Sequence, residues 1–78
     1  MNYSSENIIV KFKSGVPESV IKQIINDNDS VVIDSIPQLN VKVVKIPQGK
    51  TVKEAINLFL ESEYVEYAEV DEFIDLVD

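Results

Sequence analysis

The stretch SVVIDSIPQLNVKVVKI, residues 30–46, contains two runs of β-branched residues that are separated by Pro37 and Gln38. β-Branched side chains favour strands, and a connection this short joins antiparallel neighbours. We therefore expect strands over residues 30–36 and 39–46, paired side by side in the middle of the chain. The elements that flank this pair decide which fold contains it.

The segment before this pair predicts a strand and then a helix. In NIIVKFK, residues 7–13, alternation places Ile8, Val10 and Phe12 on one face of a strand and Ile9, Lys11 and Lys13 on the other. Pro17 suits the first position of a helix, and Glu18 complements the positive end of the helix dipole. Apolar residues then recur at helical spacing as far as about Asn26: Val20, Ile21, Ile24 and Ile25.

The segment after the pair repeats this pattern in reverse order, a helix and then a strand. Pro47 to Lys50 break the β pattern, and Thr51 with Glu54 three residues later forms a capping box that starts a helix. The helix is expected to reach about Glu61. Residues 64–70 are expected to form a strand in which Val65, Tyr67 and Glu69 alternate with Glu66, Ala68 and Val70.

The element order is therefore β-α-β-β-α-β, which predicts an α+β fold of the ferredoxin-like split β-α-β class. In this fold a four-stranded antiparallel sheet carries both helices on one face. The other face would stay open, and an apolar residue such as Ile9 on it would mark a docking surface. An ordinary solvated sheet face with scattered apolar residues is the alternative. We expect a flexible arm over residues 1–6, a domain over 7–72 and an extended tail over 73–78.

Composition excludes several classes of function. The chain has no Cys, no His and no Arg, with 7 Lys against 14 acidic residues and a net charge of −7. Disulfides, thiolate or imidazole catalysis and the common zinc sites are thereby excluded, and no metal or cofactor is expected. An acidic protein is a poor ligand for nucleic acid, and no apolar run is long enough to cross a membrane. Because no carboxylate pair accompanies a nucleophile or substrate pocket, we do not expect an enzyme.

Several segments resemble the inhibitory propeptides of subtilisin-like serine proteases. They are IIVKFKSGV at residues 8–16, IPQLNVKVVKIP at 36–47, the helix start TVKEAI at 51–56 and EYVEYAEVDEF at 63–73. The last is the most specific, because it is similar to the family's Val-x-Tyr-x-Glu-x-Asp pattern. The resemblance implies the split β-α-β fold and a one-to-one complex of an otherwise monomeric domain with a subtilisin-like protease. It also implies that the propeptide assists the folding of that protease.

The resemblance further implies a role for particular residues. The open sheet face, with Ile9, Lys11 and Tyr67, would pack on two surface helices of the protease. Glu69 and Asp71 would face the N-termini of those helices, where free N–H groups favour negative charge. The tail would lie in the substrate cleft as an extended segment: Phe73, Ile74, Asp75, Leu76, Val77 and Asp78.

Two registers of this tail remain open. In the favoured one, Ile74 occupies the apolar pocket four residues before the cleavage point and Val77 the primary pocket. In the other, Asp78 is the residue at the cleavage point and Asp75 occupies the apolar pocket, where an unpaired carboxylate is costly. The tail also departs from the family pattern, because many family members end in a Tyr, Leu or His suited to the primary pocket.

A different class of function is also compatible with the predicted fold. A regulatory domain of ferredoxin-like fold could bind an amino acid at a homodimer interface through a Gly-rich first loop, although this loop contains only Gly15.

The expected localisation depends on how the domain is made. A propeptide would be secreted as part of a protease precursor whose signal is not in this chain, whereas a stand-alone inhibitor could be cytoplasmic.

Overall fold

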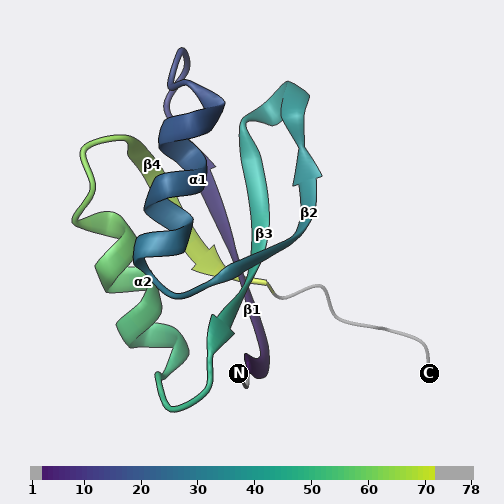
Figure 1. Cartoon of the computed structure of the whole chain (residues 1–78), viewed down its shortest axis with the longest axis vertical. Coiled ribbons are helices and arrows are strands. Elements are labelled where there is room, and N and C mark those ends of the chain that lie inside the picture. The colour runs from purple at the N-terminus through teal and green to yellow at the C-terminus, as the bar shows by residue number, and fades with distance from the viewer. Residues whose placement is uncertain (1–2, 72–78) are drawn as a thin grey trace.

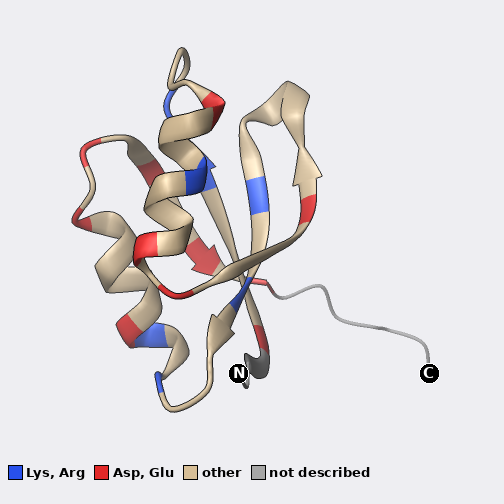
Figure 2. Cartoon of the chain, viewed as in Figure 1, with Lys and Arg blue, Asp and Glu red and all other residues tan. Residues whose placement is uncertain are grey.

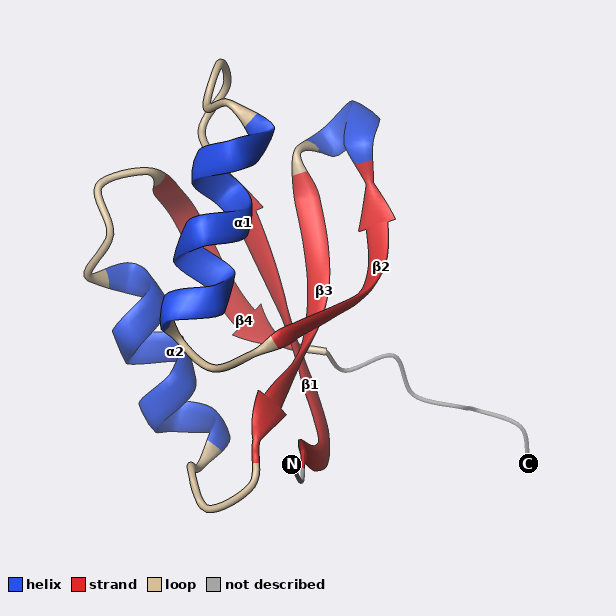
Figure 3. Ribbon diagram, viewed as in Figure 1, coloured by secondary structure: helices blue, strands red, loops and turns tan. Residues whose placement is uncertain are grey.

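The computed structural model of the chain describes residues 3–71, in which four strands and two α-helices follow the predicted order (Figure 3). A short 3-10 helix, η1, joins the second and third strands. The bounds are β1 Tyr3–Phe12, α1 Glu18–Asp27, β2 Val31–Ile36, η1 Pro37–Leu39, β3 Val41–Pro47, α2 Val52–Leu60 and β4 Val65–Val70.

The strands form one antiparallel sheet in the order β2-β3-β1-β4, so that β1 and β3 are central and β2 and β4 lie at the edges (Figure 1). Both helices cover the same face of this sheet, because side chains from α1 and α2 belong to one core cluster with those of the central strands. The α+β fold with the split β-α-β arrangement is therefore confirmed.

The core lies between the helices and the covered face of the sheet. Ile8, Val10 and Phe12 of β1 are fully buried there, as their predicted face requires. The remaining members of the buried cluster come from both helices and from two other strands: Ile21, Ile25, Val44, Ile46, Ala55, Phe59 and Val65. Alternation in β1 thus divides the strand between a core face and an open face.

Three predicted boundaries are wrong for local reasons. β1 begins at Tyr3 and not at the predicted Asn7, and the added residues lie beyond a register shift between Tyr3 and Asn7. β3 begins only at Val41, because Pro37 opens η1 and Asn40 adopts the left-handed conformation (φ 59°) that Asn tolerates. Pro17 caps α1 in an extended conformation and is not its first helical residue.

The alternation predicted for β4 is also wrong at its start. Val65 pairs with Phe12 and Tyr67 pairs with Lys11, so Glu66 is an extra residue on β4. Such a β-bulge reverses the faces on one side of it. Val65 therefore joins the core, although strict alternation would place it beside Tyr67 on the open face.

The capping box predicted at the start of α2 is confirmed. The Thr51 hydroxyl accepts a hydrogen bond from the Glu54 backbone N–H (3.1 Å), and the Thr51 backbone N–H donates to Glu54 Oε1 (2.9 Å). The hydrogen bond from the Thr51 backbone N–H to the Glu54 carboxylate, with the Thr51 hydroxyl and the positive charge of Lys50 nearby, holds the pKa of Glu54 below its ordinary value. Because the pKa is lowered on folding, the stabilisation is present at neutral pH and is lost as the pH falls through the pKa of the folded state.

Replacing Thr51 with Ala is expected to lower the free energy of unfolding by about 1 kcal/mol, because the side-chain acceptor that caps the N-terminus of α2 is removed. Thr51→Ser, which keeps the hydroxyl, is the matched control and should lie close to the parent protein. Urea unfolding followed by circular dichroism measures both. Equal losses in the two variants would show that the hydroxyl does not stabilise the helix.

Candidate interaction surface

The helices pack on one face of the sheet and leave the other face open. Directly opposed residues of antiparallel strands share a face, so the register defines rows of neighbouring side chains across it. One row runs from β2 to β4 through Ile36, Val41, Lys11 and Tyr67. The next consists of Asp34, Val43, Ile9 and Glu69. The centre of the face is therefore largely apolar, and acidic residues stand at both edges of the second row.

The structure brings the three predicted docking residues together on this face. Ile9 and Lys11 are half-buried on β1, and Tyr67 lies directly opposite Lys11 on β4 with 38% of its surface exposed. The Lys11 Nζ is 6.0 Å from the centre of the Tyr67 ring, within reach of a cation–π attraction. Lys11 therefore covers part of the aromatic ring and leaves the rest accessible to a partner.

The two predicted acidic residues lie at the C-terminal end of β4. Glu69 is exposed and opposite Ile9. The Asp71 backbone N–H donates to the Asn7 carbonyl oxygen at 3.2 Å, which extends the pairing of β4 with β1 by one residue. Alternation then places Asp71 on the same face as Glu69. Figure 2 shows that this end of β4 is acidic.

A shallow depression on the open face was not predicted from the sequence. Its lining combines four aliphatic residues with two carboxylates: Ile9, Ile33, Ile36, Val43, Asp34 and Asp71. Ile33 reaches it because β2 contains a bulge, since Val32 pairs with Val44 and Asp34 pairs with Val43. The run Val31-Val32-Ile33, apolar at three consecutive positions, was the only sequence signal that strict alternation fails in β2.

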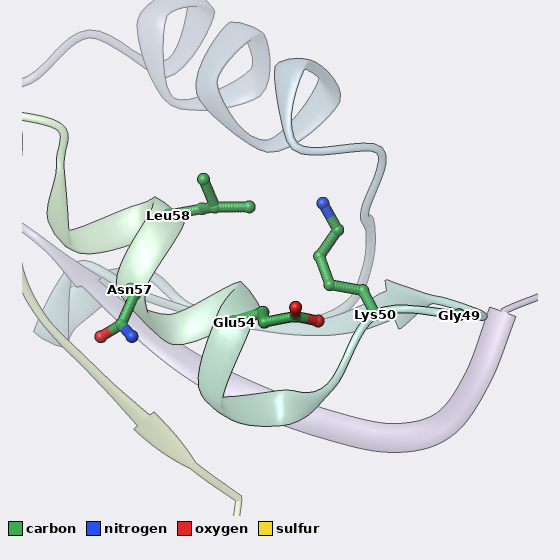
Figure 4. A pocket seen from close by; sticks show the side chains of 5 residues that line it. All are labelled: Gly49, Lys50, Glu54, Asn57 and Leu58. Carbon is green, nitrogen blue, oxygen red and sulfur yellow. The ribbon is translucent and has the colours of Figure 1, made fainter.

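Two further hollows are formed by other parts of the described chain. One lies beside α2 and is lined by Gly49, Lys50, Glu54, Asn57 and Leu58, with the Glu54 carboxylate directed towards Lys50 (Figure 4). Another borders the loop after β1, where Gly15 has a φ of +84°. Among residues 3–71, no three acidic side chains approach closely enough to hold a metal ion. No helix in this range is long and apolar enough to cross a membrane.

The predicted cleft-binding residues, Phe73, Ile74, Asp75, Leu76, Val77 and Asp78, lie outside the described residues. Their assignment therefore stays a prediction from the sequence. The last described residue, Asp71, lies on the open face at the edge strand β4.

These features define a class of protein, a small α+β domain of split β-α-β topology with one open sheet face that is apolar in its centre and acidic at its edges. The sequence profile of the Fervidolysin N-terminal prodomain matches residues 1–71. The chain therefore belongs to this family, whose members are propeptides of subtilisin-like proteases. No curated protein and no solved structure matched the chain.

Proposed function

We propose that this domain inhibits a subtilisin-like serine protease and assists the folding of that protease, without catalytic activity of its own. The family match over residues 1–71 carries the proposal, because a propeptide of this family is made together with a protease. The precursor would be secreted. The complex would contain one propeptide and one protease, and the free domain would be a monomer.

The open face is the proposed docking surface. Ile9, Lys11 and Tyr67 offer a mixed apolar and aromatic centre of the kind that protein interfaces bury. Two surface helices of the protease would lie across this face. Their N-termini would meet Glu69 and Asp71, because free backbone N–H groups and the helix dipole favour negative charge there.

Replacing Glu69 with Gln and Asp71 with Asn together is expected to weaken inhibition by about 1 to 2 kcal/mol, because two capping carboxylates lose their charge. The isolated domain should unfold at the same urea concentration as the parent, since neither side chain belongs to its core cluster. Glu61→Gln with Glu63→Gln is a matched control that removes two exposed charges from the connection before β4, at the opposite end of that strand from Glu69 and Asp71. An unchanged inhibition constant in the first variant would assign Glu69 and Asp71 to an ordinary solvated edge.

The tail supplies the second proposed contact, in the substrate cleft. In the favoured register Ile74 fills an apolar pocket, so Ile74→Ala should weaken inhibition by about 2 kcal/mol while Asp75→Ala has little effect. Val77→Leu should strengthen inhibition, because a β-branched residue fills the primary pocket poorly. Inhibition constants against one subtilisin-like enzyme measure all three. A larger loss for Asp75→Ala than for Ile74→Ala would select the other register, with Asp78 at the cleavage point.

A titration tests the proposed function itself. Adding the chain to a subtilisin-like protease should give competitive inhibition that is complete at one chain per active site. The alternative, a regulatory domain that binds an amino acid, predicts a homodimer whose melting temperature rises with the ligand. A monomeric chain that leaves several subtilisin-like proteases uninhibited at micromolar concentration would overturn the inhibitor assignment.

A further inference from the structure

The segment of residues 31–40, which comprises β2, η1 and Asn40, contributes no side chain to the core. The buried cluster and the half-buried apolar residues packed against it all come from other parts of the chain. Val31, Val32 and Ile33 are 38%, 37% and 46% exposed, and Leu39 is 52% exposed. Detaching this segment would therefore remove no side chain from the core cluster, which keeps the free energy of local opening below that of the whole domain.

Backbone pairing holds the segment on one side only. Within residues 3–71, β2 pairs with β3 alone, and the bulge at Ile33 interrupts that pairing. Its other attachments are few: Lys42 Nζ donates to Ser35 Oγ at 3.1 Å, and Phe12 N–H donates to the Asn40 carbonyl at 2.8 Å. The opposite edge strand, β4, is held more firmly because Val65 is buried in the core and Ala68 packs against it.

The other connections in the described chain are anchored more closely. The stretch between consecutive buried side chains is shorter there than from Ser30 to Val41: it runs from Phe12 to Ile21 before α1, from Ile46 to Ala55 before α2, and from Phe59 to Val65 before β4. The second also contains the capping box of Thr51 and Glu54. Residues 31–40 form the longest stretch between residues 6 and 71 without a buried side chain.

A protease binds its substrate as an extended segment that pairs edge to edge with the walls of the cleft. The outer edge of β2 already has this conformation, and exposed apolar side chains lie along it and at the turn that follows. Exposed, weakly held loops and edges are also where proteolytic nicking concentrates.

We propose that residues 31–40 are the site at which a subtilisin-like protease first cuts the folded domain, and that this cut ends inhibition. The step is ordinary hydrolysis: the peptide C–N bond breaks, and water adds a hydroxyl to the carbonyl carbon and a proton to the leaving amine. The cut separates two halves that share one core, with Ile8, Val10 and Phe12 on the first fragment and Val44, Ile46 and Phe59 on the second. Once the halves are separate chains, dilution favours their dissociation. The protease is then released.

Limited proteolysis of the whole chain by a trace of subtilisin-like protease, followed by intact-mass spectrometry, tests the site. Among cuts between residues 7 and 71, the first should fall within 31–40 and yield two fragments whose masses sum to the chain plus one water. A first cut at residues 13–17, 47–51 or 61–64 overturns the proposal.

A reversible crosslink provides the matched control. Ser35 and Lys42 are register partners on β2 and β3, so Ser35→Cys with Lys42→Cys can pin the segment to the sheet by a disulfide. The oxidised protein should be cut within 31–40 about tenfold or more slowly than the same protein reduced, because local opening is blocked. Equal rates in the two forms overturn the proposal. The comparison is internal, so the loss of the Lys42 contacts with Glu18 and Ser35 affects both forms equally.

The end of inhibition rests on the proposed function, and the outcomes separate the two. A chain that is first cut within 31–40 but inhibits no protease would overturn the proposed function and leave the cleavage site standing. A chain that inhibits a protease but is first cut in another loop would overturn the cleavage site and leave the proposed function standing. Inhibition that persists at nanomolar concentration after complete cleavage within 31–40 would overturn the claim that the cut releases the protease.

Discussion

Deletion of residues 74–78 is expected to weaken inhibition of a subtilisin-like protease by roughly 3 kcal/mol, or about a hundredfold and more. The tail and the open sheet face belong to one chain, so docking of either contact raises the effective concentration of the other. Removing the tail leaves the docking surface of Ile9, Lys11 and Tyr67 in place, and inhibition should become weak without disappearing. The inhibition constant of the truncated chain, compared with that of the full chain, measures the effect.

The deletion should not change the fold, because all the strands and helices of the described residues, 3–71, remain in the truncated chain. Circular dichroism and the urea midpoint of the truncated chain should therefore match those of the full chain. A truncated chain that inhibits as strongly as the full one would show that the tail does not enter the cleft. A truncated chain that still binds the protease but no longer blocks small substrates would support both proposed contacts separately.

Replacement of Phe59 by Ala is expected to lower the free energy of unfolding by about 3 to 5 kcal/mol. Phe59 is fully buried on α2 and is one of the two largest fully buried side chains, with Phe12 of β1. A chain of this size buries only about 60% of its unfolded surface, so its total stability is of the same order as this loss. The variant should be largely unfolded at 25 °C, as circular dichroism and urea unfolding would show.

Leu60→Ala is the matched control, since Leu60 is the next residue on the same helix and is 46% exposed. Its loss should be within about 0.5 to 1 kcal/mol. A similar loss in the two variants would contradict the burial of Phe59 in the core.

The Phe59 variant also separates a folding defect from a docking defect. A partner that binds only the folded chain shifts the folding equilibrium by mass action. The variant should therefore still inhibit at high concentration, with an apparent affinity reduced by its unfolded fraction, and should regain ordered structure in the complex. The Glu69 and Asp71 double variant should behave oppositely, with parental stability and weaker inhibition.

The sequence by itself determined the element order and the core. Ile8, Val10 and Phe12 were assigned to the buried face because a strand has a period of two residues, and that face is fully buried. The start of α2 was equally predictable, since a capping box involves only Thr51 and Glu54, three residues apart. The repeated order of strands and helices led directly to the split β-α-β topology. Each of these features depends on local periodicity or on groups close together in the chain.

Only the tertiary structure decided which side chains share the open face. The bulges at Glu66 and Ile33 are register shifts between neighbouring strands, and they place Val65 in the core and Ile33 in the depression. No local pattern reports a register shift, because the extra residue is defined only by the strand opposite it. The exposure of residues 31–40 is also a tertiary result. Their β-branched composition is that of a buried strand, but β2 lies at the edge of the sheet, where the helices reach the central strands and leave it uncovered.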